Sequence, residues 1–409
     1  MLIPQLSFGG AERVFHDQAR ELAAAGHRVT ECVFDSGVPV AFSTENALVA
    51  LDVPAAGASP LHKFRALQQR VARLRQLKAE LAIDVCISHL EGADYLNLLS
   101  KGSEKVVLCI HNSKQHDPGY VGPLGWLRRR VLMPVLYRRA DHIVTVSLEL
   151  RQELINYLNL PVDLVVTINN FVKLDAIQAC LAEGLPSTET SLFTAGPVLL
   201  VAGRLSPEKN QTALLPVLKG LQQSGHPTLR LLFLGDGPLR PVLVNEAKHL
   251  GLRVWDGAAV AGAMPPDTAA FDVILLGFRT NPFPYVARAA ISILCSLTEG
   301  FPMALCEALV CGVPVASADC PTGPREILAP ASPPTQYAAA AEWAEFGLLL
   351  PLLNQQSGQT QVVSAWVTAL HELLSNPGCY QHYVTQAHKR GQAFGSEPIM
   401  ARWEALLQE

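Results

Sequence analysis

Short apolar runs rich in β-branched residues alternate with helix-period segments along almost the whole chain, and this alternation constrains the fold more than any other feature. Crossover helices cover both faces of a parallel sheet, so its strands are continuous apolar runs. The pattern therefore predicts an α/β fold with parallel sheets. Strands are expected at 28–34, 85–89, 106–110, 142–146, 164–168, 197–202, 229–234, 273–276, 291–294 and 313–316, and helices at 208–223, 239–250 and 399–407.

The alternation pauses between residues 173 and 196 and then restarts. A chain of 409 residues is also longer than one hydrophobic core usually supports. We therefore predict an N-terminal domain over 1–172, a linker over 173–196 and a C-terminal domain over 197–395. Two segments rich in Ala, Gly or Pro, 257–270 and 329–345, are expected to be surface insertions.

Composition excludes several classes of protein. Apolar residues make up 49% of the chain and charged residues 17%, which favours packed cores over disorder. There is no run of 18 apolar residues and no signal-peptide pattern, so a cytoplasmic location is expected. The formal net charge of −4 argues against nucleic acid as the main partner. Nine cysteines lack zinc-binding spacing and are expected to be reduced and mostly buried.

The segment from Glu299 to Glu326 has the most informative functional pattern. A Gly-Phe-Pro loop at 300–302 leads into an apolar helix, and the backbone N–H groups at such a helix start favour an anion. Glu299 precedes this helix start, and Glu307 lies inside the helix. The pattern fits a ligand with hydroxyl groups at both ends and phosphate in the middle, which describes a nucleotide sugar.

Three further stretches place glycine at a predicted strand end. Gly9 and Gly10 would let the backbone approach a phosphate closely, with an ordinary strand-to-helix turn as the alternative. Arg204 and Lys209 flank a second turn, where they suit a diphosphate leaving group or mark a solvated helix start. Gly235 lies in a common type of α/β loop. The dinucleotide fingerprint G-x-G-x-x-G is absent from the first turn, which disfavours a dehydrogenase.

Taken in order, these motifs resemble those of the retaining GT-B glycosyltransferases of glycosyltransferase family 4. They are G-G-A-E-R (9–13), G-R-x-x-x-x-K (203–209), G-D-G-P (235–238), E-G-F-P-x-x-x-x-E-A-x-x-C-G-x-P-V (299–315) and C-P-T-G-P-R-E (320–326). The fourth is highly specific and the third is not. The resemblance covers nearly the whole chain outside the two insertions. It is greatest to members that build capsular, lipopolysaccharide or lipid-linked oligosaccharides.

The resemblance implies two facing Rossmann-like domains with an inter-domain cleft, and a C-terminal helix (396–409) that packs back on the N-terminal domain. The donor would be a nucleotide sugar, preferably a UDP-sugar. Its expected binding residues are Gly9, Gly10, Arg204, Lys209, Gly235, Phe278, Gly300, Phe301, Pro302, Met303, Ala304 and Glu307. The expected catalytic residues are Glu299, His111, Arg204 and Lys209.

Each of these residues has an expected role in the resemblance. Glu307 would bind the ribose hydroxyls, and Glu299 with the backbone of 300–304 would address the donor sugar and the phosphates. Arg204 and Lys209 would neutralise the diphosphate. His111 follows the strand at 106–110 and would lie near the transferred sugar, with an ordinary strand-end histidine as the alternative.

The expected mechanism needs no metal and no cofactor. The sequence has no D-x-D motif to hold a metal, so cationic side chains would stabilise the departing nucleoside diphosphate. The resemblance implies retention at the anomeric carbon, and we expect front-face attack assisted by the leaving phosphate.

Two segments combine basic side chains with apolar or aromatic ones, as in peripheral membrane helices. In 61–81 apolar residues recur at helical spacing among six Lys and Arg, and 125–139 interleaves Trp126 and Tyr137 with five arginines. Both are expected to contact an anionic membrane surface at its cytoplasmic face. The alternative is a solvated face whose apolar stripe belongs to the core.

The expected acceptor is a lipid-linked glycan or a polysaccharide. Two alternatives remain on the same fold, a sugar-nucleotide epimerase and a non-catalytic membrane-associated partner. The joint presence of Glu299, Glu307, Arg204 and Lys209 argues against the second, because a scaffold needs none of them. Only a few residues precede Gly9, so the first strand is expected to be shorter than is usual in the family.

Overall fold

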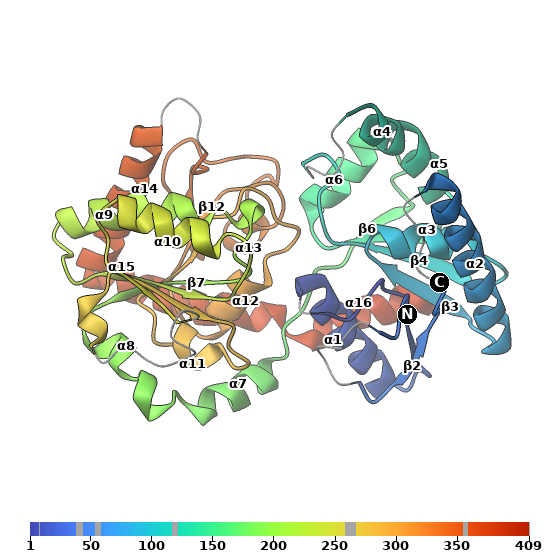
Figure 1. Ribbon diagram of the computed structural model, residues 1–409, viewed down its shortest axis with the longest axis horizontal. Coiled ribbons are helices and arrows are strands. Elements are labelled where there is room, and N and C mark those ends of the chain that lie inside the picture. Colours follow the sequence, from blue (N-terminus) through green and yellow to red (C-terminus); the bar gives the residue numbers. More distant parts are fainter. Residues whose placement is uncertain are drawn as a thin grey trace. The chain divides into compact units, whose positions relative to one another are not determined.

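The computed structural model describes residues 1–7, 9–37, 44–53, 59–116, 122–257, 267–354 and 359–408. Backbone contacts divide the chain into two compact units. Unit 1 comprises Met1–Phe171 and Ser396–Glu409, and unit 2 comprises Val172–Gly395. Each unit contains its own largely parallel sheet with helices packed on it (Figure 1), so the α/β fold predicted from the alternation is confirmed.

Unit 1 is built on six parallel strands. They are β1 (Thr30–Val33), β2 (Ala47–Ala50), β3 (Val85–His89), β4 (Lys105–Ile110), β5 (His142–Thr145) and β6 (Val165–Thr167). Strand β1 pairs with β2, and β3, β4, β5 and β6 are hydrogen-bonded neighbours in that order. Each of these strands runs parallel to its neighbour, which brings the carboxyl ends to one edge.

The first residues of the chain connect the two groups of strands in unit 1. The N–H of Leu2 donates to the carbonyl of Ile87 (2.8 Å), and the N–H of His89 donates to the carbonyl of Leu2 (2.9 Å). On the other side, the N–H of Ile3 donates to the carbonyl of Cys32 (3.0 Å). This short segment therefore lies between β1 and β3 and links their hydrogen bonding.

The described residues of unit 1 form eight helical segments. They are α1 (Gly10–Ala24), α2 (Pro60–Glu80), α3 (Glu91–Leu99), α4 (Gly122–Leu127), the π-helical η2 (Arg128–Leu132), α5 (Met133–Tyr137), α6 (Leu148–Tyr157) and α16 (Ser396–Gln408). Helix α2 contributes Leu74 and Leu77 to a buried cluster with Leu2, Cys32 and Leu96. The apolar stripe expected for membrane contact in 61–81 therefore belongs mainly to the core.

Helix α16 belongs to unit 1 although it follows unit 2 in the sequence. Ile399, Met400, Trp403 and Leu406 form its buried face. The ammonium of Lys105 on β4 donates to the carbonyl of Leu406 (3.4 Å), close to the C-terminal end of the helix, where carbonyl groups are otherwise unpaired.

Unit 2 holds an eight-stranded sheet in the order β13-β14-β12-β11-β7-β8-β10-β9. The strands are β7 (Val198–Ala202), β8 (Arg230–Leu234), β9 (Val254–Asp256), β10 (Val273–Gly277), β11 (Ile291–Leu294), β12 (Val315–Ala318), β13 (Glu342–Ala344) and β14 (Gly347–Leu350). All pairs are parallel except the edge pair β13–β14. The central strands are buried on both faces, which explains their continuous apolar sequences.

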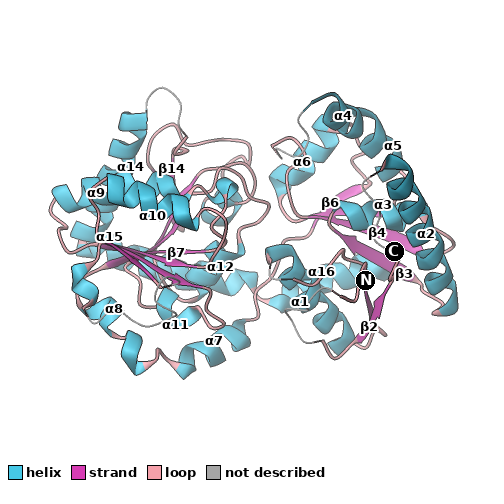
Figure 2. Ribbon diagram, viewed as in Figure 1, coloured by secondary structure: helices cyan, strands magenta, loops and turns pink. Residues whose placement is uncertain are grey.

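Helices cover both faces of this sheet (Figure 2). The α-helices are α7 (Leu174–Glu183), α8 (Ser191–Thr194), α9 (Leu214–Gln223), α10 (Arg240–His249), α11 (Phe283–Val286), α12 (Met303–Val310), α13 (Pro324–Leu328), α14 (Gln359–Ser375) and α15 (Pro377–Gly391). Short 3₁₀ turns are η3 (Ser187–Glu189), η4 (Pro207–Lys209), η5 (Gln211–Ala213), η6 (Thr268–Ala270) and η7 (Gln392–Phe394). The core contains Phe233 and Trp366, both fully buried.

The ten strands predicted from the sequence are all observed, with ends that agree within two residues. The helix predicted at 208–223 is instead divided into η4, η5 and α9, because Asn210 adopts a left-handed conformation (φ 55°). The segment 173–196, expected to be irregular, contains α7 and α8. Most of the insertion expected at 257–270 lies outside the described residues.

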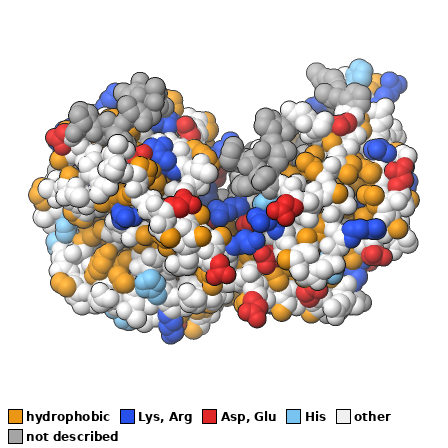
Figure 3. All heavy atoms as spheres, turned by 90° about the horizontal axis from the view of Figure 1, so that it is seen from below, with side chains coloured by type: hydrophobic (Ala, Val, Ile, Leu, Met, Phe, Trp, Pro, Cys, Tyr) orange, Lys and Arg blue, Asp and Glu red, His pale blue; other side chains and the backbone are white. Residues whose placement is uncertain are grey.

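Acidic, basic and hydrophobic side chains are interspersed over the visible face of each unit (Figure 3). Within the described parts of the chain, no helix has both the length and the apolar composition needed to cross a membrane. Helix α2 is long, but charged residues interrupt its apolar stripe.

Candidate active site

Three of the sequence motifs and Phe278 lie at one edge of the unit 2 sheet. Strands β11, β7, β8 and β10 are consecutive neighbours and run parallel, so their carboxyl ends point the same way. Glu299 follows β11, Arg204 follows β7, Gly235 follows β8 and Phe278 follows β10. Ligands of open α/β sheets bind at such an edge. The fold thus brings together residues that are up to 95 positions apart in the sequence.

The loops after β7 and β8 pack backbone against backbone. Gly235 has a φ of +134°, and a Cβ atom added there would lie 2.0 Å from the carbonyl oxygen of Gly203. The N–H of Leu205 donates to the carbonyl of Asp236 (3.0 Å). Glycine is therefore required at 235 to fix the loop that carries Arg204. The Arg204 side chain is exposed, and among the described residues no carboxylate forms an ion pair with it.

Lys209 and Glu299 form a close ion pair at this edge. The turn η4 ends at Lys209, whose Nζ lies 2.6 Å from Oε1 of Glu299. Ser296 Oγ donates to the same carboxylate oxygen (2.5 Å), and the Thr322 hydroxyl donates to the backbone carbonyl of Glu299. The Glu299 side chain is 9% exposed and that of Lys209 is 29% exposed. The carboxylate is therefore held by a cation and a hydroxyl before any ligand binds.

Two opposing effects act on the pKa of Lys209. Burial lowers the pKa of the ammonium group, whereas the adjacent Glu299 carboxylate raises it. The carboxylate prevails, so the pKa is raised above its ordinary value and the side chain is a stable cation at neutral pH. A persistent positive charge therefore lies beside Glu299, in the turn η4 that follows β7.

Helix α12 begins directly after the Gly-Phe-Pro loop, as the sequence predicts. Pro302 is the N-cap residue, and no side chain caps the helix start. Gly300, Phe301 and Pro302 are buried, whereas Met303 and Ala304 are partly exposed. The uncapped start therefore presents backbone N–H groups of the first turn near the surface.

Glu307 lies in the second turn of α12 and is partly exposed. The close approach of Gly323 (φ +100°) to Pro302 holds the preceding loop in place, because a Cβ atom at 323 would lie 2.6 Å from the proline ring. Arg325, in the C-P-T-G-P-R-E motif, is buried and does not lie at the surface. Its guanidinium contacts the carboxylates of Asp319 (2.5 Å) and Glu342 (2.8 Å).

The loop after β10 contacts the segment at 187–191 through Glu189. Phe278 is 54% exposed, and Gly277 before it has a φ of +77°. Arg279 forms an ion pair with Glu189 (3.2 Å), and the Tyr285 hydroxyl donates to the same carboxylate. Glu189 is therefore a support of the Phe278 loop that sequence reasoning missed, because no local pattern marks it.

Unit 1 contains the remaining predicted residues. Gly9 is the N-cap residue of α1 and Gly10 begins the helix, with the N–H of Arg13 donating to the carbonyl of Gly9 (3.1 Å). Neither glycine has a positive φ. A Cβ atom at Gly10 would meet nothing within 4 Å, so the surrounding protein leaves space at this helix start. Phe8 lies outside the described residues.

His111 lies just beyond the end of β4 and is hydrogen-bonded to a second histidine. Its Nε2 lies 2.8 Å from Nδ1 of His89, and the two rings stack with centroids 5.0 Å apart. Burial and the Lys114 ammonium lower the pKa of His111 to about 4. Burial and His111 lower the pKa of His89 as well. Both imidazoles are therefore neutral at pH 7.

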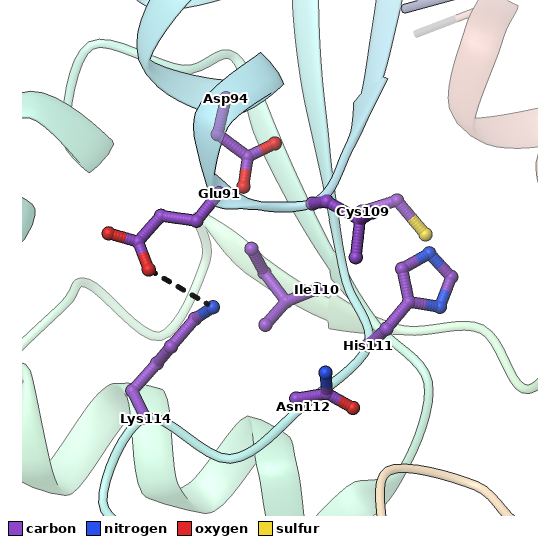
Figure 4. A pocket seen from close by; sticks show the side chains of 8 residues that line it. Glu91, Asp94, Cys109, Ile110, His111, Asn112 and Lys114 are labelled. Atoms are coloured by element: carbon purple, nitrogen blue, oxygen red, sulfur yellow. Dashed lines mark ion pairs between the residues drawn. The ribbon is translucent and has the colours of Figure 1, made fainter. Parts of the chain in front are cut away.

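A cavity of about 160 Å³ opens beside His111 within unit 1 (Figure 4). Its lining residues are Leu90, Glu91, Asp94, Cys109, Ile110, His111, Asn112 and Lys114. They come from the start of α3 and from the end of β4 with the loop that follows it. Leu90, one of the lining residues, has a φ of +71°, a strained value of the kind that clusters at functional sites.

Two carboxyl groups of this cavity have different environments. Glu91 pairs with Arg128 (2.5 Å) and with Lys114 (3.9 Å), so it has cationic partners. Asp94 is fully buried and accepts hydrogen bonds from Ser88 (2.7 Å) and Tyr137 (3.4 Å). Burial raises the pKa of Asp94 to about 8, against the opposing effect of Lys114. Asp94 is therefore largely protonated at neutral pH.

Sequence reasoning missed Asp94, Asn112 and Lys114 as cavity residues. A signal for the last two was present, since they follow the strand at 106–110 in the same way as His111. Asp94 gave a weaker signal as an acidic residue amid the apolar positions of a helix. These residues line one cavity because β3 pairs with β4, and no local sequence pattern specifies that pairing.

Comparison with known proteins matches both halves of the chain to glycosyltransferases. The family model described as Glycosyltransferase Family 4 matches residues 8–176, and that described as Glycosyl transferases group 1 matches residues 196–345. Together they span nearly all of the motifs described above.

Similar proteins of known sequence come from distant organisms. The chain is 27% identical over 281 residues to an uncharacterized glycosyltransferase of Methanocaldococcus jannaschii, a match that covers 66% of this chain and 64% of the relative, less than two thirds of its length. It is 24% identical over 343 residues to a Campylobacter jejuni N-acetylgalactosamine-N,N'-diacetylbacillosaminyl-diphospho-undecaprenol 4-alpha-N-acetylgalactosaminyltransferase, covering 83% of this chain and 80% of that one.

Among solved structures, HepE of Anabaena in complex with UDP and glucose is similar over the whole chain. The TM-score is 0.70 at 16% identity, and the match covers 100% of this chain and 98% of HepE. At this identity the likeness concerns the fold, which is of the GT-B type with two parallel sheets.

Proposed function

The chain belongs to glycosyltransferase family 4 and is a glycosyltransferase, and on this basis we propose that it transfers a sugar, with retention, from a UDP-sugar to a lipid-linked or polysaccharide acceptor. The observation that carries the proposal is the Lys209–Glu299 ion pair (2.6 Å), formed at the sheet edge that also presents Arg204. HepE, of similar fold, was solved with UDP and glucose, which supports a UDP-sugar donor.

In this proposal the unit 2 edge binds the donor. Arg204 and Lys209 neutralise the diphosphate, while the start of α12 offers backbone N–H groups to it. The loop and helix start are formed by Gly300, Phe301, Pro302, Met303 and Ala304. Gly235 lets the loop after β8 pack closely against the loop that carries Arg204. Glu299 accepts hydrogen bonds from the donor sugar, Glu307 from the ribose, and the loop at Phe278 contacts the base. In unit 1, Gly9 and Gly10 are proposed as phosphate contacts, because a Cβ atom at Gly10 would meet nothing within 4 Å.

The leaving nucleoside diphosphate is stabilised by side-chain cations without a metal in this proposal. Lys209 keeps its charge because Glu299 raises its pKa, and the Arg204 guanidinium is the second cationic group of this edge. Charge develops on the diphosphate as the glycosidic bond breaks, so fixed cations there lower the barrier. Attack of the acceptor hydroxyl on the same face, with its proton passing to the leaving phosphate, gives retention. His111, being neutral, contributes a hydrogen bond near the transferred sugar.

The C. jejuni relative is named for an undecaprenol-diphosphate-linked acceptor, which supports a lipid-linked acceptor for this chain. A peripheral membrane contact follows from that proposal. In α4, η2 and α5 the large apolar side chains of Trp126, Leu127, Val131, Leu132 and Val135 are exposed. Three consecutive arginines, 128–130, lie in the same stretch. Exposed apolar residues beside basic ones are typical of helices that lie in a membrane interface.

A donor screen tests the proposal at its first step. Purified protein is heated with UDP-sugars, GDP-mannose and free UDP, and a donor at 100 times its dissociation constant should add about 2.7 kcal/mol of stability. We expect UDP-sugars to raise the melting temperature, and E307Q to reduce this shift. The ligand that stabilises is then assayed for transfer to an undecaprenyl-diphosphate-linked glycan. Stabilisation by GDP-mannose alone would reject the UDP preference, and binding without any transfer would reject the acceptor class.

Vesicle binding tests the membrane contact separately. W126A/V135A is expected to lose at least tenfold in affinity for vesicles containing anionic lipid, with the melting temperature unchanged because both side chains are exposed. The matched control L148A removes another exposed apolar residue of unit 1, outside the segment, and should bind as wild type does. Equal binding by all three proteins would rule out this surface.

A further inference from the structure

Three soft metal-binding side chains share one face of the unit 1 sheet. In the parallel pair β3–β4, His89 lies opposite Cys109 in register, and paired residues of a parallel sheet project to the same side. His111 follows Cys109 by two positions, so the alternation along the extended chain returns it to that side. The sequence conceals this group, because 20 positions separate His89 from Cys109.

The ligand atoms of these residues are close together. One nitrogen of each histidine and the sulfur of Cys109 all lie within 4.8 Å of one another. Within the described part of the chain, no other group of three His, Cys, Asp or Glu side chains is this compact. All three residues are buried. In tetrahedral zinc sites the usual bond lengths place ligand atoms roughly 3.3–3.6 Å apart. To reach this spacing, side-chain rotations must separate the two ring nitrogens, now 2.8 Å apart, and bring together the more distant ligand atoms, which lie within 4.8 Å of one another.

We propose that His89, Cys109 and His111 form a binding site for a thiophilic divalent transition metal of the Zn²⁺ class. Two imidazoles and a thiolate are ligands that Zn²⁺ prefers, whereas Mg²⁺ and Ca²⁺ prefer oxygen. Figure 4 shows two of the three side chains, with the Cys109 sulfur next to the His111 ring.

Metal loading displaces protons from the ligand atoms, because Zn²⁺ binds thiolate and neutral imidazole. When the metal–sulfur bond forms, the S–H bond breaks and one proton leaves to solvent. The hydrogen now shared between the two rings moves to a nitrogen that does not bind the metal. His89 Nε2 can take it, since it has no hydrogen-bond partner in the structure.

The group supplies three protein ligands. In tetrahedral zinc sites with three protein ligands, water or a small ligand takes the fourth position, which is the arrangement of reactive rather than purely structural sites. Metal loading would also withdraw His111 from the hydrogen-bonding role proposed above.

Metal titration of the full chain tests the inference without any sugar transfer. Co²⁺ and then Zn²⁺ are added to chelator-treated protein under reducing conditions. We expect one Co²⁺ per chain with a thiolate-to-cobalt absorption band and tetrahedral d–d bands, and displacement of Co²⁺ by Zn²⁺. Calorimetry of Zn²⁺ binding in buffers of different ionisation enthalpy should count about one proton released, since a single thiol is deprotonated.

Matched variants decide whether this group is the site. C109S and H89N should bind Zn²⁺ at least tenfold more weakly, as loss of even an outer-shell partner costs about 10–100-fold. C86S is the control, because Cys86 is a buried thiol of β3 that packs in the separate cluster with Leu74 and Leu77. It should bind as wild type does. If C109S unfolds, C109A and H89N supply the comparison. Absence of the thiolate band, or equal binding by C109S and wild type, would overturn the site whether or not the protein transfers sugar.

Discussion

Replacing Lys209 with glutamine separates the two roles that the structure gives this residue. The substitution removes the cation 2.6 Å from Glu299 and leaves that carboxylate, which is 9% exposed, with Ser296 as its remaining side-chain donor. Breaking a fully buried ion pair costs about 3–5 kcal/mol. Because the Lys209 side chain is 29% exposed, water partly screens the pair, and we expect a loss of about 1–3 kcal/mol in the free energy of unfolding.

The effect on catalysis should be larger than the effect on stability. One preorganised donor to a developing negative charge contributes about 2.7–4 kcal/mol, so K209Q should lower kcat by about 10²–10³-fold. K209R keeps the charge and should retain more activity than K209Q. In K389Q the lost pair is the exposed Lys389–Glu345 contact (3.6 Å), so this control should change neither quantity by more than about 0.5 kcal/mol.

Urea unfolding and steady-state kinetics at saturating donor measure the two effects. A double-mutant cycle with E299Q isolates the pair, and we expect a coupling of about 1 kcal/mol or more in stability. The raised pKa of Lys209 adds a pH signature: the stabilisation is complete below the unfolded pKa of about 10.4 and is lost as pH rises through the higher folded pKa. A folded K209Q enzyme whose kcat is within threefold of wild type would refute the leaving-group role, and zero coupling would refute the energetic importance of the pair.

Three further predictions concern stability. G235A should lower the free energy of unfolding in urea by at least about 2 kcal/mol, because its Cβ atom would meet the Gly203 carbonyl. In the control G251A the position also has a positive φ, but the Cβ atom would lie in open space, so the loss should be only about 1 kcal/mol. Equal losses would contradict the packing argument. Asp94 has a folded pKa of about 8, so wild-type stability should fall as pH rises from about 4 to 8, and D94N should abolish this slope in chelator-treated protein; parallel pH profiles would show that Asp94 is ionised in the fold. R325M leaves Asp319 buried without its cation and should cost about 3–5 kcal/mol. R253M should cost less, about 1 kcal/mol, because the Arg253 side chain is 58% exposed and water screens its pair with Asp272; a small loss at both positions would mean that Asp319 is protonated.

Much of the fold could be predicted from local sequence because buried parallel strands have a local signature. The segments at 85–89 and 291–294 coincide with β3 and β11. Strands β2, β9, β13 and β14 were not predicted, and β13 (Glu342–Ala344) illustrates one reason. It is an antiparallel edge strand with Trp343 exposed, so tertiary pairing and not apolar continuity defines it.

The predicted membrane segments show how burial decides between two interpretations of one pattern. Residues 61–81 and 125–139 both interleave basic and apolar side chains. In α2 the apolar residues Leu74 and Leu77 fill the core, whereas in α4 to α5 Trp126 and Val135 are exposed. Helical periodicity reports that a face is apolar, but the partner of that face depends on where the helix docks.

The sequence by itself determined the α/β class, the strand positions and the set of motif residues at strand ends, because these follow from local apolar continuity and from glycine at turns. Only the tertiary structure decided which side chains meet. Lys209 contacts Glu299 across 90 positions because β7 and β11 are neighbours, and His89 meets Cys109 and His111 because β3 pairs with β4 in one register. Strand order and register are properties of the whole sheet. The Lys209–Glu299 ion pair and the buried His–Cys–His group therefore became visible only in the fold.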